Sequence, residues 1–288
     1  APAIVGHDAA ALDFITSFNS GRPHHAWLIA GPSGIGKASF AYDLARFVLS
    51  QNQNEDQVLR WVHARAHPDL TVLERSLNDA KPRKLKAEIS VDDSRKFIDF
   101  FARTSGNGGW RVGIVDAADD LNTESANALL KLVEEPPSKT LILLVCHAPG
   151  KLLRTLRSRC RKMPLEALSE QQASDVLHQL PLNPLPDAAV LQTAISICGG
   201  RPGFALQLIG SEGAKAFQAF VSAKRLDAAT RNTIGQHFAT RALAQQDFDV
   251  FMGLFLEWLA ERAHSSANPS LAALYSDLGK QQNIVGGY

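Results

Sequence analysis

The chain has 288 residues, of which 45% are hydrophobic and 20% are charged, and its formal net charge at pH 7 is +1. This balance excludes a disordered chain and a generally polycationic one, although charge can still be concentrated locally. The three cysteines, Cys146, Cys160 and Cys198, are widely separated, which excludes a disulfide framework and a paired-cysteine metal site. No apolar run reaches the roughly 18 residues of a bilayer-spanning helix. We therefore expect a reduced, cytoplasmic protein with no bound metal and no membrane partner.

Strand and helix patterns alternate over residues 1–165. Buried strands are expected at 25–31, 67–74, 110–119 and 140–148, and helices at 37–50 and 89–104. Asp92 is the expected N-cap of the second of these helices. Because parallel strands need helical crossovers, this alternation predicts a parallel α/β sheet with helices on both faces.

Strand signals stop at residue 166, and the remaining patterns are helical. Helices are expected at 168–180, opened by Ser169, and then at 188–200, 202–210 and 247–263. An apolar stripe at helical spacing predicts a core-facing side for the last of them: Phe248, Phe251, Phe255, Trp258 and Leu259. The sequence therefore divides into an α/β domain (1–165), a small helical domain (166–210) and an all-α domain (211–288).

A glycine-rich segment lies between the first expected strand and the first expected helix. It has the glycines and the lysine of a phosphate-binding loop: Gly31, Pro32, Ser33, Gly34, Ile35, Gly36 and Lys37. Glycines let backbone N–H groups turn toward an anion, the helix N-terminus adds positive potential, and the lysine reaches the outer phosphates. The complete context of strand, glycines, lysine and helix favours this interpretation over a tight turn with a chance lysine.

The residue after the lysine departs from the pattern of such loops. It is Ala38, where the usual Ser or Thr hydroxyl ligates Mg²⁺. Ser39 follows, but one residue along a helix is about 100° of rotation, so its hydroxyl is expected to point elsewhere. Nucleotide binding survives this change more readily than hydrolysis does.

The strand expected at 110–119 carries an acid that resembles the magnesium-binding acid of an ATPase. Four mostly apolar residues lead to Asp116, but the next residue, where a second acid would orient the attacking water, is Ala117. Asp119 and Asp120 lie further on and are not taken as substitutes. The alternative is that Asp116 only caps the following turn. Alanine at both 38 and 117 predicts that hydrolysis is lost or very slow.

Residues 124–160 carry the most specific signal in the chain. Three runs stand out in this segment: Asn127-Ala128-Leu129-Leu130-Lys131, Glu134-Glu135-Pro136-Pro137 and Ser158-Arg159-Cys160. With the phosphate loop, these runs make the chain resemble the clamp-loader branch of the AAA+ superfamily from about residue 5 to 210. Because of the alanines at 38 and 117, the chain is most similar to the delta-prime type of clamp-loader subunit of bacterial DNA polymerase III. The resemblance implies an AAA+ P-loop domain with a parallel sheet, a helical lid, and an all-α C-terminal domain that forms an oligomerisation collar.

The same resemblance assigns a role to Arg159. In the family, the arginine of the Ser-Arg-Cys run reaches across a subunit boundary as an arginine finger for a neighbour's ATP site. A solvated basic face or a contact with DNA phosphates is the alternative, and it applies to Arg154 and Arg157 at least as well. The family's first sensor position is occupied by Cys146 and His147, and the second sensor arginine is replaced by Gly203, with Arg201 two residues earlier. The cysteine zinc module of many relatives has no counterpart in residues 49–70, so no zinc is expected.

These features predict a non-catalytic, stator-like clamp-loader subunit of DNA replication without intrinsic ATPase activity. The expected partners are gamma/tau- and delta-type subunits in a hetero-oligomeric ring, which would load the sliding clamp on primed DNA. The loop could hold ATP or ADP, with Mg²⁺ only beside a bound nucleotide, and the expected contacts are residues 31–37, Ala38, Ser39 and Asp116. Two alternatives stay open: an active gamma-type AAA+ ATPase subunit, or a nucleotide-binding regulatory module without turnover.

Overall fold

The computed structural model describes residues 5–21, 23–78, 85–103, 109–182, 188–209, 211–223, 227–238, 244–266, 270–271, 273–275 and 277–278. Contacts divide the chain into two compact units. The first comprises Ala1–Pro181 together with Cys198–Phe204, and the second comprises Leu182–Ile197 and Ala205–Tyr288. The domain borders expected at residues 165 and 210 stay predictions.

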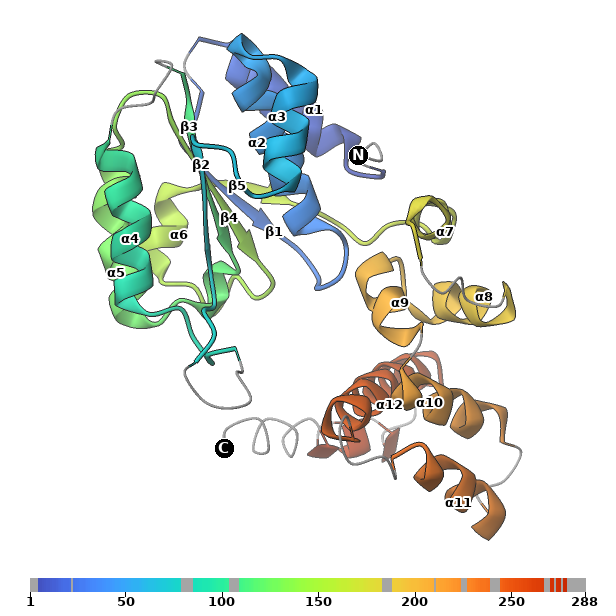
Figure 1. Cartoon of the computed structure of the whole chain (residues 1–288). Coiled ribbons are helices and arrows are strands. Elements are labelled where there is room, and N and C mark those ends of the chain that lie inside the picture. Colours follow the sequence, from blue (N-terminus) through green and yellow to red (C-terminus); the bar gives the residue numbers. More distant parts are fainter. Residues whose placement is uncertain are drawn as a thin grey trace. The chain divides into compact units, whose positions relative to one another are not determined.

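The first unit is built on a parallel sheet in the order β2-β3-β4-β1-β5 (Figure 1). Its strands are β1 (Ala26–Ala30), β2 (Leu70–Glu74), β3 (Arg111–Asp116), β4 (Thr140–Cys146) and β5 (Arg161–Pro164). All four neighbouring pairs are parallel, and β4 at the centre is buried along its whole length. The expected parallel α/β sheet is confirmed, and it brings the carboxyl ends of β1, β3 and β4 to one edge.

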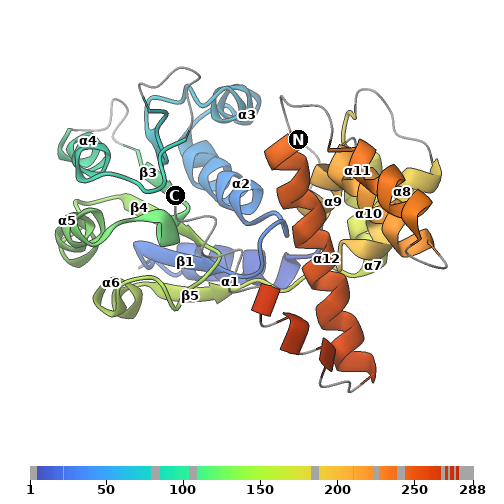
Figure 2. The ribbon, with the colours of Figure 1, turned by 90° about the horizontal axis from the view of Figure 1, so that it is seen from below.

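Helices cover both faces of this sheet. One face carries α1 (Asp8–Asn19), α2 (Lys37–Leu49) and α3 (Glu55–His63), and the other carries α4 (Val91–Ala102), α5 (Thr123–Glu134) and α6 (Arg154–Arg159), as Figure 2 shows from below. Each face has its own apolar core. The first is formed around Phe14, Trp27 and Phe40, and the second around Phe97, Phe101 and Leu129. The sheet positions the loops that follow its strands because it is held rigidly from both sides.

Two N-caps were expected from the sequence, and one of them is confirmed. The N-cap of α4 is Ser90, not Asp92 as expected, because the Ser90 side chain accepts the Asp93 amide while Asp92 already lies within the first helical turn. Ser169 does cap α7 (Glu170–Gln179), and it forms a reciprocal capping box with Gln172. The sequence patterns did not indicate α1, α3, α6 or β5.

The second unit is helical throughout its described residues. It contains α8 (Ala188–Ile197), most of α9 (Pro202–Leu208), α10 (Glu212–Ser222), α11 (Ala228–Gln236) and α12 (Ala244–Ser266). The expected stripe of α12 packs on α10, where Phe220 meets the rings of Phe255 and Trp258 edge-on at centroid distances of 5.2 and 5.3 Å. Phe248, expected on that core-facing stripe, remains 45% exposed.

Candidate functional site

The phosphate loop connects β1 to α2, and its geometry explains its glycines. Gly34 and Gly36 have φ values of +83° and +94°, in the left-handed region that glycine tolerates best. Gly36 is also the residue that opens α2. At Gly31 a Cβ atom would lie 2.3 Å from the backbone oxygen of Leu165, which follows β5. The loop therefore needs glycine at these positions simply to fold.

Lys37 is turned back onto its own loop. Its side-chain nitrogen donates hydrogen bonds to the carbonyl oxygens of Gly31 at 2.8 Å and Pro32 at 2.6 Å. The residue is only 3% exposed, and this burial lowers its pKa to about 8, against the opposing effect of Asp119 and two other nearby groups. Two of the three N–H donors of this ammonium group are therefore bonded within the loop, which leaves one for a phosphate.

Further along the loop, two other carbonyl groups accept hydrogen bonds from outside it. Nε2 of His7 lies 3.0 Å from the Ile35 oxygen, and the amide of Gly203 donates to the Gly34 oxygen at 2.8 Å. The segment Cys198–Phe204 belongs to the first compact unit, so this contact lies within one unit. Within that segment, Arg201 donates from Nε to the Cys198 oxygen and lies over the Phe204 ring. The loop is thus fixed by lysine, histidine and backbone groups of its own chain.

The acid at the end of β3 lies beside this loop. Asp116 is half-buried, and burial raises the pKa of its carboxyl group above the ordinary value, although His147 acts in the opposite direction. Ala117 is buried next to it and offers no second carboxylate. The carboxylate expected to hold Mg²⁺ is thus present at the end of β3, and the adjacent position expected to orient an attacking water has none.

Asp119 ties the end of β3 to the end of β4. Its Oδ1 accepts the His147 amide at 2.8 Å, and its carboxylate also interacts with the Cys146 thiol. Burial alone would raise the pKa of Asp119, but these hydrogen bonds outweigh it and leave that pKa below its usual range. Asp119 thus holds Cys146 and His147 in place at the end of β4.

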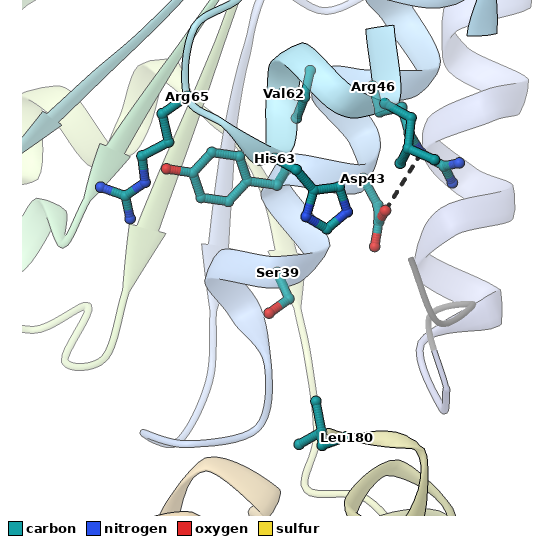
Figure 3. Close-up of a pocket in the computed structure, with 9 residues that line it drawn as sticks. Ser39, Asp43, Arg46, Val62, His63, Arg65 and Leu180 are labelled. Carbon is teal, nitrogen blue, oxygen red and sulfur yellow. Dashed lines mark ion pairs between the residues drawn. The ribbon is translucent and has the colours of Figure 1, made fainter. Parts of the chain in front are cut away.

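Ser39 lies on a different surface from the loop. Its side chain lines a cavity of about 310 Å³ between α2 and α3 (Figure 3). The same cavity is lined by Asp43 and Arg46, whose side chains form an ion pair at 3.5 Å, and by His63. Ser39 therefore does not replace the hydroxyl that Ala38 lacks.

A second candidate site lies at the end of α6. Arg159 is 40% exposed; its Nη1 donates to the Thr155 oxygen at 2.9 Å, and its Nε lies 2.6 Å from Oε1 of Glu134, which ends α5. Two neighbouring arginines serve the fold instead: Arg157 donates to the Pro149 oxygen, and Arg161 pairs with Asp13. Arg159 is thus more exposed than Arg157, whereas Arg161 is equally exposed, at 40%, but also lies over the Trp27 ring.

Comparison with known proteins identifies the family. A family model described as DNA polymerase III, delta subunit, matches residues 6–169. The chain belongs to this family. The delta' subunit of DNA polymerase III from Pseudomonas aeruginosa is 32% identical over 247 residues, which cover 82% of this chain and 70% of that protein.

Two further relatives extend this comparison. The delta' subunit of Escherichia coli is 34% identical over 200 residues, 67% of this chain and 57% of that protein. The tau subunit of Escherichia coli is 31% identical over 189 residues, 62% of this chain but only 26% of that protein. The chain thus spans somewhat more than half the length of the second delta' protein. The residues that match the delta-prime-like clamp-loader family lie in the first unit, the α/β domain that carries the phosphate loop.

Solved structures with a similar backbone trace have low sequence identity to this chain. A DNA polymerase III gamma subunit-related protein from Thermotoga maritima has 16% identity and a TM-score of 0.44, with 92% of this chain and 90% of that chain covered. A Thermotoga maritima RuvB variant has 16% identity and a TM-score of 0.49, with 94% and 82% covered. Both TM-scores are below 0.5, so the family assignment rests on the sequence relatives.

The predicted site residues lie at three places in the structure. Residues 31–37, Ala38 and Asp116 gather at the carboxyl edge of the sheet, Ser39 lies on the cavity between α2 and α3, and Arg159 contacts α5 and α6. The sequence carried no sign of His7 or of the roles of Asp119 and Glu134: Asp119 was considered only as a substitute for the second acid, and Glu134 lay in the run Glu134-Glu135-Pro136-Pro137. The described residues contain no group of three metal-ligating side chains, and none of their helices is long and apolar enough to span a bilayer.

Proposed function

We propose that this chain is a non-catalytic, stator-like subunit of a replicative clamp loader, and that it supplies Arg159 in trans to a neighbouring ATPase subunit. The observation that carries this proposal is the contrast between two sites of the first unit. The ammonium group of Lys37 is bonded to carbonyl oxygens of its own loop and the next residue is Ala38, whereas the side chain of Arg159 is 40% exposed at the surface.

The loop fits a nucleotide better than it fits a magnesium ion. Its left-handed glycines and the N-terminus of α2 suit a polyphosphate, and Lys37 would contact that phosphate through the N–H donor not bonded to Gly31 or Pro32. Magnesium, when bound beside a nucleotide, neutralises phosphate charge. Of its usual protein ligands only Asp116 is present, because residue 38 is alanine, and Ala117 leaves no adjacent acid to orient an attacking water. ATP or ADP is therefore proposed as a ligand without turnover.

The chemistry of arginine suits the role proposed for Arg159. A guanidinium is always charged and presents five N–H donors in a planar fork that matches phosphate oxygens. Two of these donors are occupied by Thr155 and Glu134, so the others are available to an anion. An arginine supplied in trans stabilises the charge that develops during phosphoryl transfer, which accelerates hydrolysis by about 10³-fold or more in other systems.

The proposed partners are those that the names of its relatives suggest. Gamma/tau- and delta-type subunits would form a hetero-oligomeric ring with this chain through its helical C-terminal region, residues 211–288. The ring would act on the sliding clamp and primed DNA in the cytoplasm. Similarity to tau supports one alternative, an active gamma-type ATPase subunit. A nucleotide-binding regulatory module without turnover is the other.

Binding and turnover assays on the purified chain separate these three functions. We expect no multiple-turnover ATP hydrolysis, with or without Mg²⁺ and primed DNA. Sustained hydrolysis that is abolished by Lys37→Met would contradict the proposal and favour the gamma-type enzyme. Tight ATP binding without turnover, combined with full activity of a complex that contains Arg159→Ala, would favour the regulatory module.

A further inference from the structure

Glu134 lies against the exposed arginine at the end of α6. Its Oε1 is 2.6 Å from Nε of Arg159, while the Thr155 oxygen accepts Nη1 of the same guanidinium at 2.9 Å. The two acceptors come from different helices, Glu134 from the last residue of α5 and Thr155 from α6. The guanidinium is therefore held from two directions although its side chain is 40% exposed.

The position of Glu134 in its helix is unfavourable unless it has a cationic partner. The C-terminus of a helix carries partial negative charge, so an acid in its last turn is repelled and a cation there is attracted. Glu134 ends α5, and Arg159 brings a cation to it in addition to Lys131, which lies in the same last turn. The side chain of Glu134 is itself 43% exposed, so it is not needed to fill the core. Its contact with Arg159 is the interaction that this position provides.

We infer that Glu134 is a positioning residue for Arg159: it holds Nε so that the outer edge of the guanidinium faces an anion on a neighbouring subunit. This inference rests on the proposed function, because it assumes that Arg159 meets a phosphate in trans. A free arginine side chain loses much rotamer entropy when it is fixed, and a guanidinium already anchored at Nε loses less when it binds. Anchoring at one end therefore strengthens phosphate contact at the other.

The chain offers matched variants for a test. Glu134→Gln keeps an oxygen that accepts Nε–H and removes only the charge, whereas Glu134→Ala removes both. Glu135→Ala is the control, because Glu135 is exposed and adjacent to Glu134. Among the described residues, Arg159 forms its ion pair with Glu134 and not with Glu135. The assay is DNA-stimulated ATP hydrolysis by the full chain reconstituted with its gamma/tau- and delta-type partner subunits, with assembly of each variant complex checked by gel filtration.

The expected result is a graded loss that depends on Arg159. Glu134→Ala lowers kcat by about twofold to fivefold, as expected when more arginine rotamer entropy is lost on binding. Glu134→Gln recovers most of this loss, and Glu135→Ala retains full activity. Adding Glu134→Ala to Arg159→Ala causes no further loss, because a residue that acts only through Arg159 has nothing left to position.

Two outcomes overturn the inference, and they differ from failure of the proposed function. If Arg159→Ala lowers activity but Glu134→Ala does not, the finger stands and its positioning by Glu134 is wrong. If the two losses multiply in the double variant, Glu134 acts independently of Arg159 and the inference is also wrong. If Arg159→Ala itself has no effect, the proposed function fails, and the inference fails with it.

Discussion

The phosphate loop and the surface around Arg159 use their polar groups in opposite ways. In the loop, the ammonium of Lys37 is buried and bonded to two carbonyl groups of its own segment. At the end of α6, the guanidinium of Arg159 is exposed and shares only surface contacts. In the proposed function, the loop holds a nucleotide without turnover, whereas the arginine acts on a neighbouring subunit. Each of the predictions below tests one side of this contrast.

The largest expected effect on stability comes from the loop. Gly31→Ala places a methyl group 2.3 Å from the Leu165 oxygen and 2.8 Å from Ile35, so we expect a loss of about 3 kcal/mol in the free energy of unfolding. Gly150→Ala is the matched control, since a Cβ atom there meets nothing within 4 Å. Urea denaturation measures both. Equal stability of the two variants would show that the loop is not tightly packed.

The buried lysine should give the loop a distinctive dependence on pH. Because its pKa is about 8 in the folded chain and 10.5 in the unfolded one, the unfolded chain binds more protons between these values, and stability contributed by Lys37 rises with pH across this window. Relative to Lys37→Met, the wild-type chain should gain about 2 kcal/mol between pH 7.5 and 10. Denaturation curves at both pH values measure this difference. Parallel pH profiles for the two proteins would mean that Lys37 is solvated rather than buried.

A smaller effect is expected at the junction of β3 and β4. Asp119→Ala removes the acceptor of the His147 amide and should cost about 1–2 kcal/mol, whereas Asp119→Asn keeps an acceptor oxygen and should cost less. Because the pKa of Asp119 is lowered on folding, its contribution is present above the carboxyl's usual pKa and is lost as the pH falls through the folded-state value. Thermal melts at pH 7 and pH 3 measure this loss. A larger loss from Asn than from Ala would contradict the hydrogen-bond assignment.

The smallest effect on stability is expected at Arg159. An ion pair between two side chains that are 40% and 43% exposed contributes little, so Arg159→Ala should change the free energy of unfolding by less than about 0.5 kcal/mol. Urea denaturation of the isolated chain checks this value. A loss above about 1 kcal/mol would show that Arg159 serves the fold, as Arg157 and Arg161 do.

Much of the fold could be predicted because its signals are local. Apolar runs located β1, β3 and β4, and the glycines with Lys37 located the phosphate loop. The helix α6 is only six residues long and β5 only four, too short for periodicity to show. The sequence predicted Asp92 as the cap of α4, but both Ser90 and Asp92 are good capping residues, and the helix begins two residues earlier, after Ser90.

The partners within the site could not be predicted from the sequence. His7 lies 28 residues from Ile35, and Gly203 meets Gly34 from a distant segment, so no spacing links them. Glu134 and Arg159 are brought together by the packing of α5 against α6. These tertiary contacts fix the phosphate loop and Arg159, and no local pattern in the sequence specifies them.

The most direct test of the account is the DNA-stimulated ATPase activity of a reconstituted clamp loader that contains Arg159→Ala. We predict intact assembly and a loss of at least about tenfold, because the neighbouring ATP site loses its arginine. Arg154→Ala, which removes an exposed arginine from the same helix, is the control, and the complex that contains it should retain full ATPase activity. Unchanged activity with Arg159→Ala, or an equal loss with both variants, would contradict the account.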